Sequence, residues 1–176
     1  MDGNDGDVVA LVRGGALGDF VLTLPVIRAL RNAFPESRLL LIGHPATARL
    51  AGEAKRIDAD SAEWARMYTP AGPSAGLAAS LANCRLLVAC LPGGRQAAPT
   101  NYRRNLHGLC KDLLFGDPRP EPGQTRHMVE RLLDPIRDAG MTLPDSSTPC
   151  IDLPTRTPKQ DLLILHPGSG GRGKCW

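Results

Sequence analysis

The sequence predicts an α/β fold built on a parallel sheet, and three consecutive segments near the N-terminus carry that prediction. Residues 7–12 (DVVALV) form a short apolar run, rich in β-branched side chains, of the kind found in strands buried on both faces of a sheet. After a glycine-rich turn, residues 20–34 repeat apolar side chains every three or four positions, which is typical of an amphipathic helix. A second apolar run at 38–43 completes a strand, helix, strand unit whose crossover should be right-handed.

Length and composition favour one soluble domain of ordinary size. The chain has 176 residues, of which 42% are apolar and 22% charged, and its formal net charge of +3 is too small to predict a nucleic-acid binder. Its five cysteines are scattered without the spacing of metal ligands, which is typical of reduced thiols in a cytosolic protein. The acidic N-terminus does not resemble a signal peptide, and no apolar run is long enough to span a bilayer. We therefore expect a cytoplasmic protein.

The elements that follow are less regular. Pro25 lies inside the first helical stretch and predicts either a late helix start or a kink. Residues 95–122 hold so much Pro, Arg, Asn and Gly that no element is predicted there. For the rest of the chain we expect two helices, a third buried strand and a longer helix that stops at Gly140, at residues 46–55, 76–82, 85–91 and 125–139, respectively.

The last segment of the sequence predicts the start of a second domain. Proline-punctuated linkers at 145–149 and 153–158 precede a new apolar strand at 161–166 and a glycine-rich loop. A strand and loop of this kind should lead into a helix that packs on the sheet, and a lone strand is not stable without partners. We therefore expect residues 1–158 to form the first domain with its linker, and residues 159–176 to open a truncated second one.

Asp19 is the candidate functional residue of the first glycine-rich loop. It follows Gly15 and Gly18, which match only the second half of a dinucleotide-binding fingerprint. It stands in the first turn of the expected helix, at the carboxyl end of the first strand, where α/β proteins place their ligands. Two interpretations remain open: an acidic residue that stabilises the helix dipole, or a catalytic carboxylate.

The second loop, residues 168–174, satisfies the pattern G-x-x-x-x-G-K after a strand, so a P-loop nucleotide hydrolase is one hypothesis. Cys175 argues against it, because that position should carry a Ser or Thr hydroxyl for magnesium, and a thiol is a poor ligand for this hard ion. A looser phosphate-binding loop, with backbone donors and Lys174, fits better.

Taken together, the two loops resemble glycosyltransferase family 9, the ADP-heptose:lipopolysaccharide heptosyltransferases. Residues 8–35 (VVALVRGGALGDFVLTLPVIRALRNAFP) are similar to the N-terminal motif of that family. Residues 162–176 (LLILHPGSGGRGKCW) are similar to its interdomain motif, and residues 127–140 to its helix before the linker. The resemblance is strongest over 7–43 and 161–176 and is vague between 55 and 123.

The resemblance implies a Rossmann-like parallel sheet that forms the N-terminal, acceptor-side half of a GT-B two-domain fold. In that family Asp19 would be the general base of an inverting transfer, and Gly15 and Gly18 would let acceptor and donor approach the backbone. The donor diphosphate would be held by Ser169, Gly170 and Lys174, without a metal or other cofactor. The implied donor is a nucleotide sugar such as ADP-heptose. The implied acceptor is a lipid-linked saccharide of the lipopolysaccharide-core type, which implies peripheral contact with the inner membrane.

One departure from the family pattern leaves the acceptor open. The family commonly shows an acidic strand end and Gln-Gly after the third strand, whereas this chain has Ala-Cys-Leu-Pro-Gly-Gly at 89–94. Arg95, Arg103 and Arg104 are either contacts for an acceptor phosphate or a solvated surface. The alternative function is a stand-alone sugar-binding or nucleotide-binding domain without catalytic activity. A transferase needs both walls of its cleft, so the 176-residue chain alone is expected to transfer sugar poorly or not at all.

Overall fold

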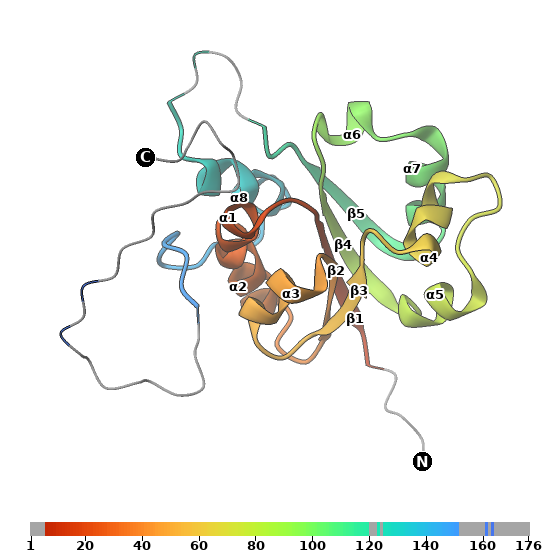
Figure 1. The fold of residues 1–176 in the computed structure, drawn as a ribbon, viewed down its shortest axis with the longest axis horizontal. Helices are drawn as coiled ribbons and strands as arrows, with labels where there is room; N and C mark the ends of the chain where they lie inside the picture. Colours follow the sequence, from red (N-terminus) through yellow and green to blue (C-terminus); the bar gives the residue numbers. More distant parts are fainter. Residues whose placement is uncertain (1–5, 120–122, 124, 152–160, 162, 164–176) are drawn as a thin grey trace.

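A parallel sheet forms the centre of the computed structural model, which describes residues 6–119, 123, 125–151, 161 and 163. Within that part of the chain the sheet has five strands in the order β3-β2-β1-β4-β5 (Figure 1). All four strand pairs are parallel. The strands are β1 (Val8–Arg13), β2 (Arg38–Gly43), β3 (Lys55–Asp58), β4 (Cys84–Cys90) and β5 (Cys110–Gly116). The predicted Rossmann-like α/β class is confirmed.

Helices cover both faces of the sheet and give three layers (Figure 1). One face packs against α2 (Leu24–Ala33) and α8 (Met128–Asp138), with α1 (Leu17–Val21) beside them. The other face packs against α4 (Ala62–Ala65), α5 (Ala75–Ser80) and α7 (Thr100–His107). Because side chains alternate along a strand, β1 supplies Val9 and Leu11 to the first core and Val8, Ala10 and Val12 to the second. The apolar run of β1 is therefore buried on both faces, as predicted.

The first helical stretch is two helices, and Pro25 explains the division. Helix α1 ends at Val21 and α2 begins at Leu24, which places Pro25 in the first turn of α2, where its missing N–H leaves no hydrogen bond unmade. Between the helices, the buried Thr23 donates its hydroxyl to the carbonyl oxygen of Asp19 at 2.9 Å. The late helix start is thus confirmed.

The prediction of one helix over residues 46–55 is wrong in its second half. A short helix α3 (Pro45–Ala48) and a 3-10 turn η1 (Arg49–Ala51) come first, and the chain then reverses at Gly52, whose φ of +72° favours glycine. Lys55 begins β3, the edge strand paired with β2. Charged side chains are common on edge strands, and in Lys-Arg-Ile-Asp they hide the apolar alternation that marks a strand.

The other expected elements are present with small shifts of their ends. The helices predicted at 76–82 and 125–139 are α5 and α8, and the strand predicted at 85–91 is β4. Helix α8 begins after His127, whose ring nitrogen Nδ1 accepts a hydrogen bond from the N–H of Val129 at 3.3 Å. Gly140, with a φ of +72°, ends it as expected.

The segment without predicted elements, residues 95–122, holds α6 (Gly94–Ala97) at its start, then α7 and β5. Polar side chains of α7 fasten the loop after the 3-10 turn η2 (Arg66–Tyr68). The amide of Asn105 donates to the carbonyl oxygens of Met67 and Thr69 at 2.9 and 3.0 Å. Arg104 donates to the carbonyl oxygen of Pro70 at 3.1 Å. The polar composition of α7 therefore has a structural use, and the exposed Arg104 has a hydrogen-bond partner within the protein.

The predicted second-domain strand at 161–166 and its loop lie outside the described residues, apart from Asp161 and Leu163, and so does the predicted boundary at 158/159. No helix in the described part of the chain combines the length and the apolar character needed to cross a membrane.

Candidate functional site

The candidate site lies at the carboxyl edge of the sheet, between β1 and β4. The chain leaves β1 toward β2 on one side, and β4 and β5 follow on the other side, so the strand order reverses at β1. In open α/β sheets, ligands bind in the crevice at the carboxyl ends of strands at such a switch point. There the chain leaves β1 at Arg13 and passes through a glycine-rich loop into α1, whose first turn holds Asp19.

A cavity of about 380 Å³ opens at this switch point. It is formed by the loop between β1 and α1, by the end of β4, and by the segment after β5. Its lining residues are Arg13, Gly14, Gly15, Asp19, Cys90, Leu91, Pro92, Pro118 and Arg119. Two of the predicted site residues, Gly15 and Asp19, therefore lie together at one cavity.

The carboxylate of Asp19 is held along one side and open on the other. Its Oδ2 accepts a hydrogen bond from the backbone N–H of Ala16 at 3.1 Å, and its Oδ1 lies 3.3 Å from Nη2 of Arg13. The side chain is still 50% exposed. The contact with Ala16 satisfies a free N–H at the start of α1, which is the structural role expected of an acidic residue there. The exposed side leaves room for a second partner.

Gly15 makes room for that carboxylate. Its φ is +110°, a backbone conformation that is strained for every residue with a side chain. A Cβ at this position would also lie 2.8 Å from Oδ2 of Asp19. Gly18 differs, because an added Cβ there would meet nothing within 4 Å. The approach of a donor or acceptor to these two glycines remains a prediction.

Arg13 is a site residue that the sequence analysis did not select. It ends β1 and is only 7% exposed, yet its side chain reaches the carboxylate of Asp19. Its Nε is buried without a hydrogen-bond partner among the described residues. A charged residue at the end of a strand buried on both faces, directly before a glycine loop, was a signal that pointed to it.

Cys90 lies next to Arg13 across the sheet, in the last register pair between β1 and β4. Burial raises the pKa of the Cys90 thiol to about 11, although the nearby Arg13 cation lowers it in part. The thiol is therefore protonated at neutral pH and is not a nucleophile there.

Arg119 provides a second guanidinium at the cavity. Oδ1 of Asp117 accepts hydrogen bonds from the backbone N–H of Arg119 at 2.9 Å and from its Nε at 3.5 Å. Partial burial raises the pKa of Asp117, but hydrogen bonds from the backbones of Arg119 and Gly93 and from the Arg119 side chain outweigh it, so the pKa is lowered. No sequence signal identified Arg119, because it falls in the stretch without predicted elements.

The site thus combines one half-exposed carboxylate with two guanidinium groups against walls of Leu91, Pro92 and Pro118. Such a carboxylate is placed to take a proton from a hydroxyl, and guanidinium groups hold phosphates or carboxylates. Among the described residues, no group of three His, Cys, Asp or Glu side chains is arranged to hold a metal ion. The predicted donor-phosphate residues Ser169, Gly170 and Lys174 lie outside the described residues.

Comparison with known proteins supports the fold. No protein-family model matches the chain, and no curated protein matches it. A solved glycosyl transferase of family 9 from Veillonella parvula matches with a TM-score of 0.51 and 13% identity, over 84% of this chain and 45% of that protein. The E. coli heptosyltransferase WaaC, solved with ADP, matches with a TM-score of 0.45 and 15% identity, over 79% and 49%. The chain therefore spans about half the length of these structures, and its sheet and helices follow the fold of the family 9 enzyme.

Proposed function

We propose that this chain is the acceptor-side half of an inverting glycosyltransferase that moves a heptose or related sugar from an ADP-sugar to a lipopolysaccharide-core-type acceptor. The observation that carries the proposal is the position of Asp19 at the switch point of the sheet. Its carboxylate is held by Arg13 and Ala16 and is half exposed. The family 9 motif at 8–35 and the fold likeness to a family 9 structure support it.

In the proposed reaction, Asp19 acts as general base. The acceptor hydroxyl donates its proton to the half-exposed carboxylate while its own oxygen attacks the anomeric carbon of the donor sugar. The bond from that carbon to the diphosphate breaks, and ADP leaves with the electron pair, so the anomeric configuration inverts in one displacement. A base must lie within hydrogen-bond reach of the proton it takes, and the open side of Asp19 offers that reach.

The remaining groups hold the reactants. Arg13 keeps the carboxylate in place through the 3.3 Å ion pair, and Gly15 leaves the space that this position needs. Arg119 faces the same cavity and suits an acidic group on the acceptor. The loop with Ser169, Gly170 and Lys174 is proposed to bind the donor diphosphate and offset the charge on the leaving group, without a resident metal.

The test first determines by sequencing whether the reading frame continues past codon 176. The protein encoded by the whole frame is assayed with ADP-heptose, as wild type and as Asp19→Asn. The amide accepts the same hydrogen bond from Ala16 but takes no proton, so we expect turnover to fall at least a hundredfold, at unchanged donor affinity. Asp7→Asn, a surface carboxylate at the other end of β1, is the matched control and should keep full turnover.

Turnover of Asp19→Asn within threefold of wild type would overturn the role of Asp19. Donor binding without any transfer in the wild type would favour the alternative, a binding domain without catalytic activity. The 176-residue chain alone is expected to transfer sugar poorly or not at all. Measurable transfer by it would contradict the hypothesis that catalysis needs a second domain to complete the cleft.

A further inference from the structure

A second cavity lies at the end of the sheet opposite Asp19. It has a volume of about 540 Å³ and opens where β1, β2 and β3 begin. Val8 lines this cavity and Arg13 lines the candidate site, and these residues are the two ends of β1. Five residue steps along a parallel strand span about 16 Å, so the two hollows are separate sites. Pockets that take small ligands usually measure about 300 to 1,000 Å³.

The interior of this cavity is apolar. Val8 and Leu40 line it from the core on one face of the sheet, where both are almost fully buried. Phe34, Leu39 and Ala54 line it from the other face, where they are partly buried. An apolar surface of this kind takes up hydrocarbon, and each CH₂ group removed from water there contributes about 0.8 kcal/mol.

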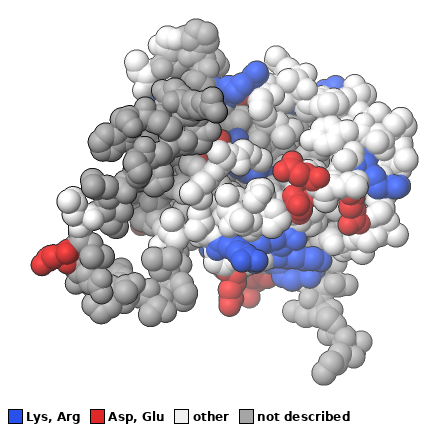
Figure 2. Space-filling view, in the orientation of Figure 1, with Lys and Arg blue, Asp and Glu red and all other residues white. Residues whose placement is uncertain are grey.

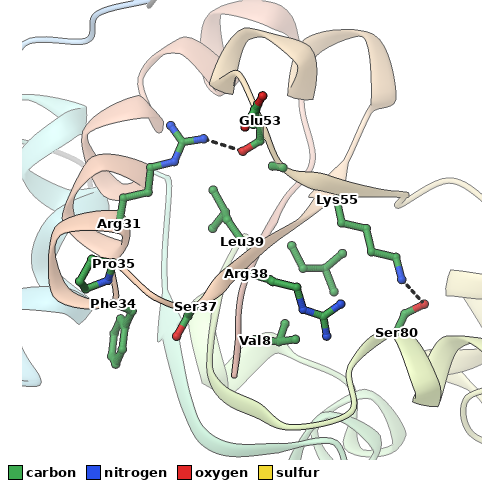
Figure 3. Close-up of a pocket in the computed structure, with 12 residues that line it drawn as sticks. Val8, Arg31, Phe34, Pro35, Ser37, Arg38, Leu39, Glu53, Lys55 and Ser80 are labelled. Atoms are coloured by element: carbon green, nitrogen blue, oxygen red, sulfur yellow. Dashed lines mark hydrogen bonds between the residues drawn. The ribbon is translucent and has the colours of Figure 1, made fainter. Parts of the chain in front are cut away.

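Cations surround the apolar interior. Arg31, Arg38 and Lys55 line the cavity together with one carboxylate residue, Glu53. Arg31 and Lys55 by themselves already outnumber that carboxylate. In Figure 3, Arg31 lies on one side of Leu39, and Arg38 and Lys55 lie on the other. Figure 2 shows that Lys and Arg side chains also gather on the surface of the molecule at this end of the sheet.

Two of these cations are positioned without being neutralised. Arg31 donates from Nη2 to the carbonyl oxygens of Ala51 and Glu53 at 2.6 and 2.8 Å. Lys55 donates from Nζ to the hydroxyl of Ser80 at 3.2 Å. Carbonyl and hydroxyl oxygens fix the direction of a cation but carry no net charge. Within the described residues, neither Arg31 nor Lys55 forms an ion pair with a carboxylate, so their positive field acts on whatever enters the cavity.

We propose that this cavity is a binding site for an organic carboxylate with an acyl-chain body. The hydrocarbon would lie against Leu39, Phe34 and Ala54, and the carboxylate would sit at the rim beside Lys55. A carboxylate there exchanges water for charge-assisted hydrogen bonds, which are stronger than neutral ones. The site has no part in the proposed sugar transfer, so the two proposals stand or fall separately.

The experiment is a ¹H–¹⁵N NMR titration of the labelled 176-residue chain with decanoate. We expect saturable shifts at Leu39, Ala54 and Lys55, with the amides of Gly15 and Asp19 unchanged. Butanoate keeps the carboxylate but loses most of the apolar body, and it should bind at least tenfold more weakly. Decyltrimethylammonium keeps the apolar body but reverses the charge, and it should not saturate these shifts.

A pair of variants on one strand tests the role of charge. Lys55→Gln removes a cation that lines the cavity, and we expect decanoate affinity to fall at least fivefold. Arg56→Gln removes the same charge from the next residue, which points to the other face of β3 and donates to the carbonyl oxygen of Gly52 at 2.5 Å. Its affinity should stay within twofold of wild type. The proposal is overturned by the absence of saturable shifts, by equal binding of decanoate and decyltrimethylammonium, or by equal losses in the two variants.

Discussion

The ion pair between Arg13 and Asp19 joins a buried cation to a half-exposed anion, so its two partners should respond differently to removal. The side chain of Arg13 is 8% exposed and that of Asp19 is 50% exposed. When Asp19→Ala removes the anion, the guanidinium stays buried without its counter-charge. When Arg13→Met removes the cation, water can solvate the carboxylate that remains, and the methionine fills part of the same space.

The magnitudes follow from this asymmetry. Breaking a fully buried pair costs about 3 to 5 kcal/mol, and the half-exposed partner reduces this for Asp19→Ala to about 2.5 kcal/mol of unfolding free energy. Of that, about 0.5 to 1 kcal/mol is the lost hydrogen bond to Ala16 at the start of α1. Arg13→Met should cost about 1 kcal/mol. The double variant should cost only about 2 kcal/mol, because no unpaired guanidinium remains, which leaves a coupling energy of about 1.5 kcal/mol.

The assay is urea unfolding at pH 7, followed by circular dichroism, with equal m-values required of all variants. Asp7→Ala is the control, because its 3.7 Å contact with Arg85 joins two side chains that are each 55% exposed, and its cost should stay below about 0.5 kcal/mol. If Asp19→Ala costs no more than Arg13→Met, or if the two costs simply add, then Arg13 does not depend on Asp19 for its buried position and the proposed seat of the base is wrong.

Three further predictions concern residues around the site and the core. Gly15→Ala should cost about 1 to 3 kcal/mol in the same urea assay, because its φ is +110° and its Cβ would press on Asp19, whereas Gly14→Ala, which meets nothing within 4 Å, should be nearly neutral. Asn105→Ala should lower the unfolding free energy by about 1 to 2 kcal/mol, because the carbonyl oxygens of Met67 and Thr69 lose their hydrogen-bond donor. Protease should then cleave the 67–70 loop faster in the variant than in wild type, and equal cleavage rates would contradict this. Burial raises the pKa values of the Cys84 and Cys90 thiols to about 12 and about 11, so the unfolded chain loses these protons first as pH rises, and stability should fall from about pH 8.5 upward. Cys84→Ala/Cys90→Ala should flatten that part of the stability profile, and an unchanged slope would refute the assignment.

The strands at the centre of the sheet were predictable because they are buried on both faces. In β1, β2 and β4, apolar residues stand at nearly every position, and no competing pattern obscures them. The two edge strands were missed for the opposite reason. β3 reads Lys-Arg-Ile-Asp, and β5 begins Cys-Lys-Asp, so solvent exposure at the edges had replaced the apolar pattern by a polar one.

The site divides in the same way between local and long-range information. Gly15 lies in the loop after β1 and Asp19 in the first turn of α1, and their spacing after a buried strand places them at the carboxyl edge of any parallel sheet. Arg119 reaches the same cavity only because β5 lies beside β4, a pairing between segments about twenty-six residues apart that no local pattern encodes. The sequence also could not show why position 15 requires glycine, because the contact that excludes a side chain there is made by Asp19 once α1 has formed.

Arg13 connects these two kinds of information. The sequence places Arg13 directly after the strand predicted at 7–12, and in the structure it is the last residue of β1. Its guanidinium is buried and needs a counter-charge, which Asp19 in the first turn of α1 supplies. An acidic residue that served only to cap α1 would need the contact with Ala16 and nothing more. The contact with Arg13 adds a second constraint, because Oδ1 lies 3.3 Å from Nη2 of Arg13 while Oδ2 accepts from the N–H of Ala16, so the carboxylate is held in one orientation at the cavity. A general base needs that orientation and a helix cap does not, so in the double-variant cycle the coupling energy measures the part of the Asp19 environment that capping leaves unexplained.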